Sequence, residues 1–306
     1  AGGLTPMPAA PASRPILGLG GSDHDVNACL LRDGKIVVAI EEERLLRRKY
    51  GLGGNLLEGR AWRYCLEAAG GLRVAETGEV VADSILAAPA LYACSRRARR
   101  LDHHLLHAAA AFLTSPFPRA AVLVVDNAGD LYRDPADGAD KLQATSWYLA
   151  EGRRIELLGR VGATGWVEGP PVLGRPYQRG DGDHSLGHFY KKVTGALGFR
   201  YPHDAPPDGW FFPEDGITMG LAAYGDERHV EALWRLVELL PAGGYRLPLR
   251  DGRLDALLAR WLRGGAAHQP QPAAVGAAAP GVKTPKQKHQ IKHQKAADRA
   301  DPHKQT

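Results

Sequence analysis

Apolar and polar positions alternate along residues 15–49 in the pattern of a β-meander. Turn residues interrupt this alternation first around Gly20 to Asp25 and then at Asp33 and Gly34. Asp and Gly both tolerate the positive φ that a tight hairpin turn demands, so the second interruption is a strong hairpin signal. The chain is therefore predicted to begin with three antiparallel strands, followed by a helix or loop that ends near Lys49.

Helical spacing follows over residues 61–69 and, more clearly, over 95–112. Ser95 is a residue type that caps helices, and Pro116 is one that stops them. A continuous apolar run then covers 121–125, which is typical of a strand covered on both faces. We expect a buried central strand that ends in Asp126, directly after the second helix.

Beyond Asp126 the pattern predicts a loop, a hairpin and further helices. Residues 130–140 are loop-like, 146–162 alternate as a hairpin that turns at 151–152, and 185–199 have a helical pattern. A further set of apolar residues recurs at helical spacing, which indicates contact with the core rather than a groove for a partner. This set is Val230, Leu233, Trp234, Val237 and Leu240. Strands and helices together predict an α/β protein.

Composition divides the chain into three parts. Of the 306 residues, 44% are hydrophobic, which is enough for a buried core. Residues 1–14 form a loose leader of small residues and prolines, 15–263 the folded domain, and 264–306 a tail too poor in apolar residues to order itself. We interpret the tail as a frameshifted or foreign extension. A basic arm that binds nucleic acid is the less favoured alternative, because the tail has no aromatic residue for base stacking.

Charge and cysteine content exclude several functional classes. The formal net charge of +5 is contributed entirely by 283–306, so the folded part has no basic surface that would predict a nucleic-acid partner. Cys29, Cys65 and Cys94 follow no disulfide or CxxC pattern, which favours a reducing compartment. Neither a signal peptide nor an apolar run of the roughly 20 residues that span a bilayer is present. We expect a cytoplasmic protein without a membrane partner.

The most informative chemistry is the pair His103 and His107, followed by Asp126. On a helix the i,i+4 spacing puts both imidazoles on one face, and a carboxylate at a strand end can complete a facial metal site with open coordination positions. His104 lies about 100° around the helix from His103, so on this interpretation it is a supporting or surface residue. The alternative is that these histidines only form structural hydrogen bonds.

Two turns have residues suited to binding an anion or a nucleotide. Ser22, Asp23 and His24 occupy the first turn of the meander, where backbone N–H groups can hold a phosphate and His24 can exchange a proton near neutral pH. Asn127 and Gly129 follow the strand that ends in Asp126 and permit close approach to a ligand. Ordinary polar turns are the alternative for both segments.

Two further segments contain candidate binding residues. Lys49 ends a charged run and can reach an anionic substrate, although a solvated charged face explains the same residues. Gly220 lies within GITMGLAAYG at 216–225, where three glycines among small and aromatic residues suggest backbone packed closely against another element or a ligand.

Together these segments resemble the O-carbamoyltransferases of antibiotic and nodulation-factor biosynthesis, the NodU/CmcH family. The matching blocks occur in one order between about Pro15 and Gly264, and their combined order is far more specific than any one of them. They are the HD turn at 24–25, EERLLRRK at 42–49, HHLLHAAAAF at 103–112, VVDNAGD at 124–130, and SLGHFY at 185–190 with MGLAAYG at 219–225.

The resemblance implies an actin/Hsp70/sugar-kinase-like ATPase fold, present here in part, which in the family is followed by a YrdC-like domain. ATP and carbamoyl phosphate would form carbamoyl adenylate in the YrdC-like part, and the ATPase-like part would pass the carbamoyl group to a hydroxyl of a small metabolite such as an aminoglycoside, a macrolide or a sugar. It also implies a divalent metal, commonly iron, on His103, His107 and Asp126, and an acceptor and donor site at His24 and Lys49.

The second ATPase-like half and the YrdC-like domain of the family have no match in this sequence. We therefore expect that this chain alone does not form carbamoyl adenylate, and a separate YrdC-like chain is a candidate partner. Two other functions remain open from the sequence: a non-catalytic metal- or nucleotide-binding module that needs a partner chain, and a sugar-kinase-like phosphotransferase. The second is disfavoured because sugar kinases do not need an HxxxH motif with an aspartate.

Overall fold

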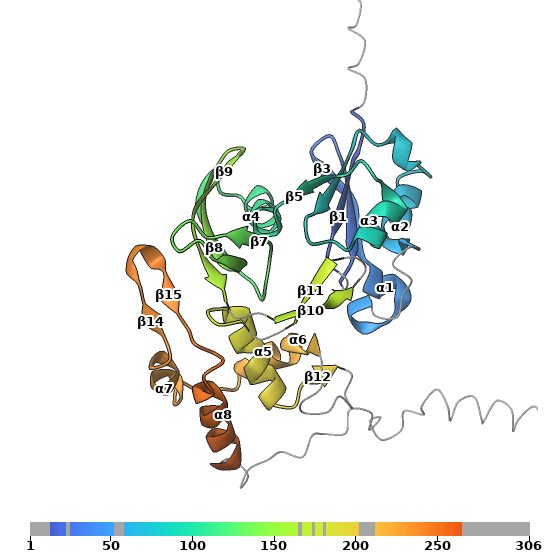
Figure 1. Ribbon diagram of the computed structural model, residues 1–306. Helices are drawn as coiled ribbons and strands as arrows, with labels where there is room; N and C mark the ends of the chain where they lie inside the picture. The colour runs from blue at the N-terminus through green and yellow to red at the C-terminus, as the bar shows by residue number, and fades with distance from the viewer. Residues whose placement is uncertain are drawn as a thin grey trace, which may run out of the picture. The chain divides into compact units, whose positions relative to one another are not determined.

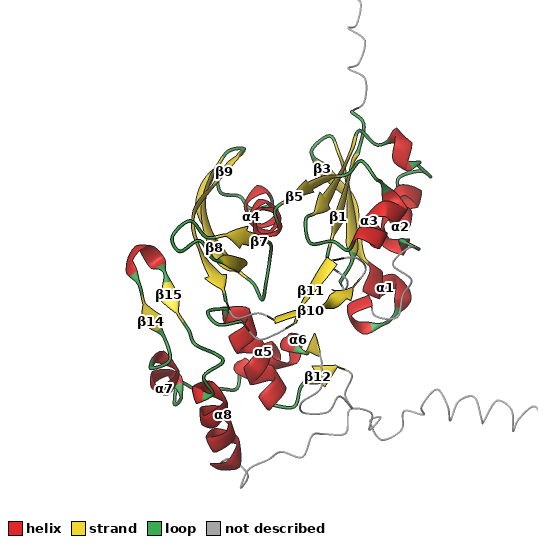
Figure 2. Cartoon of the chain, viewed as in Figure 1, coloured by secondary structure: helices red, strands yellow, loops and turns green. Residues whose placement is uncertain are grey.

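The computed structural model describes residues 13–22, 25–51, 58–164, 167–172, 175–179, 182–201 and 212–264. Most of the predicted leader, the predicted tail from 265 on, and the candidate residues Asp23 and His24 lie outside these ranges. Residues 1–258 form one compact unit, and 259–306 form a second, of which only 259–264 are described. The first unit is a mixed α/β structure, as the sequence predicts (Figures 1 and 2).

A five-stranded sheet forms the N-terminal part, in the order β3-β2-β1-β4-β5. The first three strands are the predicted antiparallel meander, and Asp33 and Gly34 turn its second hairpin with φ values of 53° and 72°. The next two strands run parallel to β1. The bounds are β1 Ile16–Gly20, β2 Asn27–Arg32, β3 Lys35–Glu41, β4 Glu79–Asp83 and β5 Arg99–Leu101.

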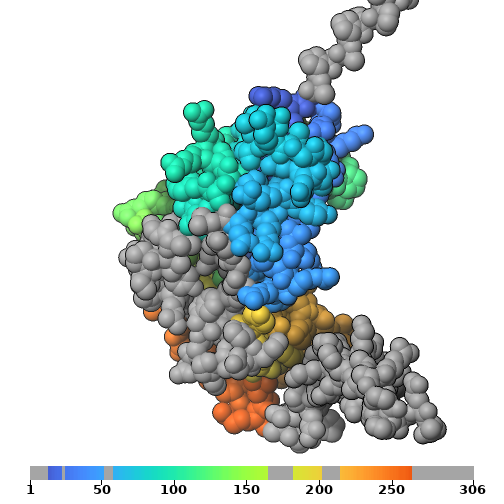
Figure 3. Space-filling model, turned by 90° about the vertical axis from the view of Figure 1, so that its right-hand side faces the viewer, coloured from blue at the N-terminus to red at the C-terminus, as the bar shows by residue number. Residues whose placement is uncertain are grey.

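Helices pack on this sheet and enclose its core. The elements are α1 Glu42–Leu46, α2 Arg60–Ala68 and α3 Ala88–Cys94, with 3-10 turns at Lys49–Gly51 and Val74–Glu76. Leu17 and Leu30 of the sheet and Cys65 of α2 have no exposed surface and belong to one cluster of buried residues. Figure 3 views the molecule from the side on which α2 lies. All three cysteines are free thiols.

Glu42 stabilises the start of α2, where Gly59 has no side chain to cap the helix. Its buried carboxylate accepts hydrogen bonds from the backbone N–H groups of Arg60 at 3.2 Å and Ala61 at 2.7 Å. Because the orphan donors of a first turn need acceptors, we expect Glu42→Gln to lower the free energy of unfolding by about 0.5–2 kcal/mol. Urea unfolding measures this, with Glu67→Gln on the exposed face of α2 as the control, and equal stability of both variants would contradict it.

The predicted helix over 95–112 is replaced by a strand and a shorter helix, α4 His103–Leu113. Residues 99–101 are extended because they pair with β4 as the last strand of the sheet. Asp102, not Ser95, caps the helix: its side chain accepts a hydrogen bond from the backbone N–H of Leu105 at 2.8 Å. Sequence periodicity could not detect this boundary, because it is imposed by pairing with a strand distant in the sequence.

A second, antiparallel sheet follows, in which β8 pairs with three other strands. The hairpin predicted over 146–162 is present as β8 and β9, but its first strand begins earlier, at Asp140, and its turn lies at Gly152 and Arg153, one residue later than predicted. β7 lies within residues 130–140, which were predicted to be a loop; it is short and is held by pairing with β8. The bounds are β6 Arg119–Val125, β7 Leu131–Arg133, β8 Asp140–Glu151 and β9 Arg154–Ala163.

β6 was predicted to be a central strand covered on both faces, and this is wrong for the described part of the chain. It pairs only with β8 among the described strands. Val122 and Val124 are buried and pack with Phe112 of α4, whereas Leu123 is 66% and Val125 48% exposed. A run of apolar residues does not reveal whether a second layer covers its outer face.

The remaining elements are short strand pairs and helices. The predicted helix at 185–199 is α5. The apolar set at 230–240 does not form one helix, because α7 ends at Trp234 and Val237 and Leu240 lie beyond it. The expected contact with the core is wrong for Val230 and Trp234, which are 44% and 57% exposed. No described helix is long and apolar enough to cross a bilayer. The bounds are β10 Val167–Val172, β11 Arg175–Arg179, α5 Leu186–Ala196, β12 Arg200–Tyr201, β13 Phe212–Pro213, α6 Asp215–Ala222, α7 Val230–Trp234, β14 Glu238–Leu239, β15 Tyr245–Arg246 and α8 Arg253–Gly264, with a 3-10 turn at Pro241–Gly243.

Candidate metal centre

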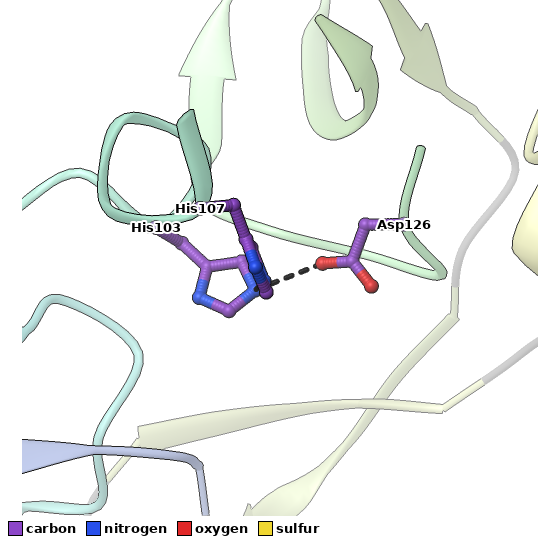
Figure 4. Close-up of side chains that lie close together, drawn as sticks. All are labelled: His103, His107 and Asp126. Atoms are coloured by element: carbon purple, nitrogen blue, oxygen red, sulfur yellow. Dashed lines mark hydrogen bonds and ion pairs between the residues drawn. The ribbon is translucent and has the colours of Figure 1, made fainter. Parts of the chain in front are cut away.

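His103, His107 and Asp126 converge as the sequence predicts. The two histidines lie on one face in the first turns of α4, and Asp126 directly follows β6, which packs against that helix. Each residue offers a ligand atom, and these atoms lie within 4.8 Å of one another. Figure 4 shows both rings pointing from α4 toward the carboxylate. The trio could therefore hold a single cation.

His103 is the central member of this cluster, because both of its ring nitrogens have partners. Its Nε2 lies 2.8 Å from Oδ2 of Asp126 and 3.1 Å from Nε2 of His107. Its Nδ1 lies 2.7 Å from Oδ2 of Asp83, at the end of β4. Asp83 is a residue that the sequence analysis missed, although it ends an apolar run, EVVAD, just as Asp126 does.

The start of α4 is held by a hydrogen-bond network around Asp130, which directly precedes β7. The backbone N–H of His103 donates to Oδ2 of Asp130 at 2.8 Å, and the side chain of Ser84 donates to the same oxygen. Gln143 links Asp130 to Asp102, the residue that caps α4. Its Nε2 donates to Asp102 at 2.6 Å, and its Oε1 accepts from the backbone N–H of Asp130 at 3.1 Å. This network fixes the first turn of the helix and with it the candidate metal ligands.

His104 is fully buried behind the cluster, so it is a supporting residue and not a surface residue. Its Nδ1 lies 2.7 Å from Oγ of Ser146, and its Nε2 has no hydrogen-bond partner and lies 3.8 Å from Oδ2 of Asp126. Gly129 packs against the same ring: a Cβ there would lie 2.8 Å from Cδ2 of His104. What the structure shows for Gly129, which was predicted to bind phosphate, is that it makes room for a buried imidazole.

The charges in the cluster shift the pKa values of its members. Burial disfavours the imidazolium of His103, but hydrogen bonds to Asp126 and Asp83 outweigh this and raise its pKa to about 10. Burial, together with repulsion from His103, lowers the pKa of His107, and burial lowers the pKa of His104 to about 4. Burial would raise the pKa of Asp126, but its bond to His103 lowers it. In the metal-free protein one cation, the His103 imidazolium, therefore already lies between two carboxylates.

The metal-free protein should lose stability as the pH rises from about 7 to about 10. The pKa of His103 is about 10 in the folded chain and about 6.5 in the unfolded chain. The stability that the His103 imidazolium contributes is therefore fully present below about pH 6.5 and is lost as the pH rises through about 10. Urea unfolding in the presence of a chelator measures this for the wild type and for His103→Ala. We expect a shallower pH dependence in the variant, and identical slopes would contradict the prediction.

Asn127 lies next to the cluster and is fixed by α5. The backbone N–H of Asn127 donates to Oδ1 of Asp126 at 2.6 Å, and its carbonyl accepts from Oγ of Ser185, the residue that caps α5, at 2.8 Å. Gly187 allows this approach, since a Cβ there would lie 2.5 Å from Cα of Asn127. The SLGHFY segment thus orients the loop that presents Asp126.

Lys49 is exposed and lies in a second polar cluster. Its ammonium is 5.0 Å from the ring centre of Tyr50. Burial raises the pKa of Asp215, at the start of α6, and the positive charge of Lys49 acts in the opposite direction and lowers it. The backbone N–H of Asp25 donates to the carbonyl of Tyr50 at 3.0 Å, so the residue after His24 is tied to the Lys49 segment. Asp23 and His24 themselves lie outside the described residues.

The other two candidate residues are not brought to the metal cluster by any described contact. Ser22 follows β1, and its carbonyl accepts from the backbone N–H of Ala87 at 3.1 Å. Gly220 lies on α6, and a Cβ at Gly220 or Gly216 would meet nothing within 4 Å. The close packing against another element that was expected for 216–225 is therefore absent at these two glycines.

Chemically, the cluster could hold a divalent metal. Two imidazoles and one carboxylate form the ligand set of facial sites for Fe²⁺ and similar ions and leave coordination positions open for substrate oxygens. The Nδ1 contact of His103 with Asp83 is the carboxylate–histidine arrangement that accompanies such ligands. The residues present therefore fit a metal of this kind.

Comparison with known proteins identifies the family. The family described as carbamoyltransferase N-terminus matches residues 91–253, a range that contains the whole cluster except Asp83. Nodulation protein NolNO of Sinorhizobium fredii (strain NBRC 101917 / NGR234) is 29% identical over an alignment that covers 74% of this chain and 32% of that protein. The uncharacterized protein sll1178 of Synechocystis sp. (strain ATCC 27184 / PCC 6803 / Kazusa) is 26% identical over an alignment that covers 76% of this chain and 38% of that protein.

The chain belongs to the family of carbamoyltransferase N-termini, because the family match covers more than half of it. This confirms the resemblance stated from the sequence motifs. The chain spans about a third of the length of the two curated relatives.

Proposed function

We propose that this chain is the N-terminal, metal-binding portion of an O-carbamoyltransferase. The observation that supports this most directly is the convergence of His103, His107 and Asp126, two of them on one helix, within the family's matched range. The acceptor would be a hydroxyl of a small metabolite such as an aminoglycoside, a macrolide or a sugar. Carbamoyl phosphate and ATP would be the co-substrates, and a YrdC-like chain would supply the adenylation step.

We further propose an actin/Hsp70/sugar-kinase-like ATPase fold for the folded part. The sheet order β3-β2-β1-β4-β5 supports it, because an antiparallel meander is extended by strands parallel to β1. The second sheet has related antiparallel pairing, since β6 pairs with β8 and β8 pairs with β9. In such a fold the turns after β1 and β6 would face a nucleotide. The residues proposed to contact its phosphates are therefore Ser22, Asp23, Asn127 and Gly129, and Gly220 is a further candidate for nucleotide binding.

In the proposed reaction the acceptor hydroxyl attacks the carbamoyl carbon of carbamoyl adenylate. A new C–O bond forms, the bond from that carbon to the AMP phosphate breaks, and the hydroxyl proton passes to His24 as general base. Lys49 would balance negative charge on the leaving phosphate as a point charge. A divalent metal held by His103, His107 and Asp126 would supply further stabilisation of phosphate oxygens.

The test is an assay of the chain with ATP, carbamoyl phosphate, Mg²⁺, Fe²⁺ and a panel of hydroxylated acceptors, with and without a separate YrdC-like chain. Mass spectrometry should find an acceptor heavier by one carbamoyl group only in the complete mixture. Acceptor phosphorylation with release of ADP would instead show a sugar-kinase-like phosphotransferase. Metal or nucleotide binding without any product in the complete mixture would show a non-catalytic binding module. Either of these results overturns the proposal.

A further inference from the structure

We propose that Asp83 is a positioning residue of the metal centre, one that fixes the ring of His103 so that Nε2 faces the ion. This inference rests on the proposed metal site and extends it to a residue outside the family's matched range. Asp83 ends β4 in the first sheet, whereas Asp126 follows β6 in the second. The ring of His103 therefore lies between carboxylates supplied by two different sheets.

Both carboxylate oxygens of Asp83 have defined partners. Oδ1 accepts from the backbone N–H of Ile85 at 3.0 Å within the turn that follows β4, and Oδ2 lies 2.7 Å from Nδ1 of His103. The residue is 4% exposed, so water does not compete strongly for either oxygen. The turn thus locks the carboxylate in one orientation, and the carboxylate in turn sets the orientation of the imidazole.

Asp83 is not itself placed to bind the ion. It contacts Nδ1, whereas Nε2, on the other side of the ring, lies 2.8 Å from Asp126 and 3.1 Å from His107. The two nitrogens of an imidazole point away from each other, so a group that bonds to Nδ1 cannot share a cation with Nε2. Asp83 acts on the ion only through His103.

The chemical consequence concerns the tautomer of His103. A carboxylate can only accept, so it keeps the proton on Nδ1 and leaves the lone pair of Nε2 directed at the metal. An acceptor with a full negative charge also makes the ligating nitrogen more basic. Mutation of a partner of this kind typically lowers metal affinity by roughly 10–100-fold.

An amide at this position should therefore be harmful even though it has nearly the same shape. In Asp83→Asn the oxygen is needed for the backbone N–H of Ile85, which turns the NH₂ group toward Nδ1 of His103. That NH₂ group can only donate, so Nδ1 must become the acceptor and the proton moves to Nε2, where it blocks the metal. A residue that merely supported the turn would tolerate this substitution.

The experiment is Co²⁺ titration of the full chain, followed through visible absorption bands and calorimetry, for the wild type, Asp83→Asn, Asp83→Ala and the control Glu79→Gln. Glu79 lies on the same strand, and its carboxylate pairs with Arg99 at the surface. We expect both Asp83 variants to bind Co²⁺ about 10–100-fold more weakly than the wild type, with Asn no better than Ala, and the control to bind unchanged. Melting temperatures taken without metal separate this effect from unfolding.

The outcomes distinguish this inference from the proposal on which it rests. If the wild type binds Co²⁺ and Asp83→Asn binds it equally well with the same spectrum, the positioning role is refuted while the metal site stands. If the wild type does not bind Co²⁺, the metal site itself fails, and Asp83 has no such role.

Discussion

His103→Ala and His107→Ala should each lower the affinity for Fe²⁺ by more than about 100-fold. Each removes one of the three ligand atoms that the chain brings within 4.8 Å of one another. Loss of a residue that only supports a ligand costs roughly 10–100-fold, so loss of a ligand should cost more. His103→Ala should also destabilise the fold, because it leaves the buried carboxylate of Asp83 without its imidazole partner. Isothermal titration with Fe²⁺ under anaerobic conditions measures both variants.

The control for these variants is His229→Ala. His229 precedes α7 and takes no part in the metal cluster. Its replacement should leave the Fe²⁺ affinity unchanged. That result would show that the lower affinity of the other two variants comes from the cluster and not from the removal of any one histidine. Wild-type affinity in both His103→Ala and His107→Ala would remove the metal from this account.

Gly187→Ala should destabilise the fold by about 1–3 kcal/mol. A Cβ at this position would lie 2.5 Å from Cα and 2.6 Å from N of Asn127, and backbone atoms cannot rotate away as the end of a flexible side chain can. Since Asn127 follows Asp126 directly, displacement of this loop should also weaken Fe²⁺ binding. Urea unfolding measures the first effect and calorimetry the second.

Gly220→Ala is the matched control, because it is the same substitution on a helix with the opposite expectation. A Cβ at Gly220 would meet nothing within 4 Å, and alanine is the better helix former by roughly 1 kcal/mol. The free energy of unfolding should therefore stay the same or rise. Destabilisation of both variants to the same degree would contradict the packing argument for Gly187.

Local signals in the sequence predict the parts of the fold that local chemistry determines. The β1 to β3 meander follows from its apolar alternation and from Asp33 and Gly34, which adopt the positive φ that the turn requires. The β8 and β9 hairpin follows from the same kind of pattern. The helical spacing of His103 and His107, with Asp126 at a strand end, likewise predicted the residues that converge.

The sequence could not predict features that depend on distant parts of the chain. The helix over 95–112 was wrong because pairing with β4 holds 99–101 extended, and no local pattern reports that pairing. Asp83 was missed although it ends an apolar strand as Asp126 does, because the sequence does not show that the end of β4 reaches the ring of His103. The exposed face of β6 shows that an apolar run alone does not determine how many layers cover a strand.

The most direct test of the central claim is X-ray absorption spectroscopy of the purified chain loaded with Fe²⁺. We predict an iron environment with two imidazole nitrogens and oxygen ligands in the wild type, and loss of the imidazole signal in the double variant His103→Ala, His107→Ala. An environment of oxygen atoms alone in the wild type, the same as that of the double variant, would contradict a metal centre built on His103, His107 and Asp126.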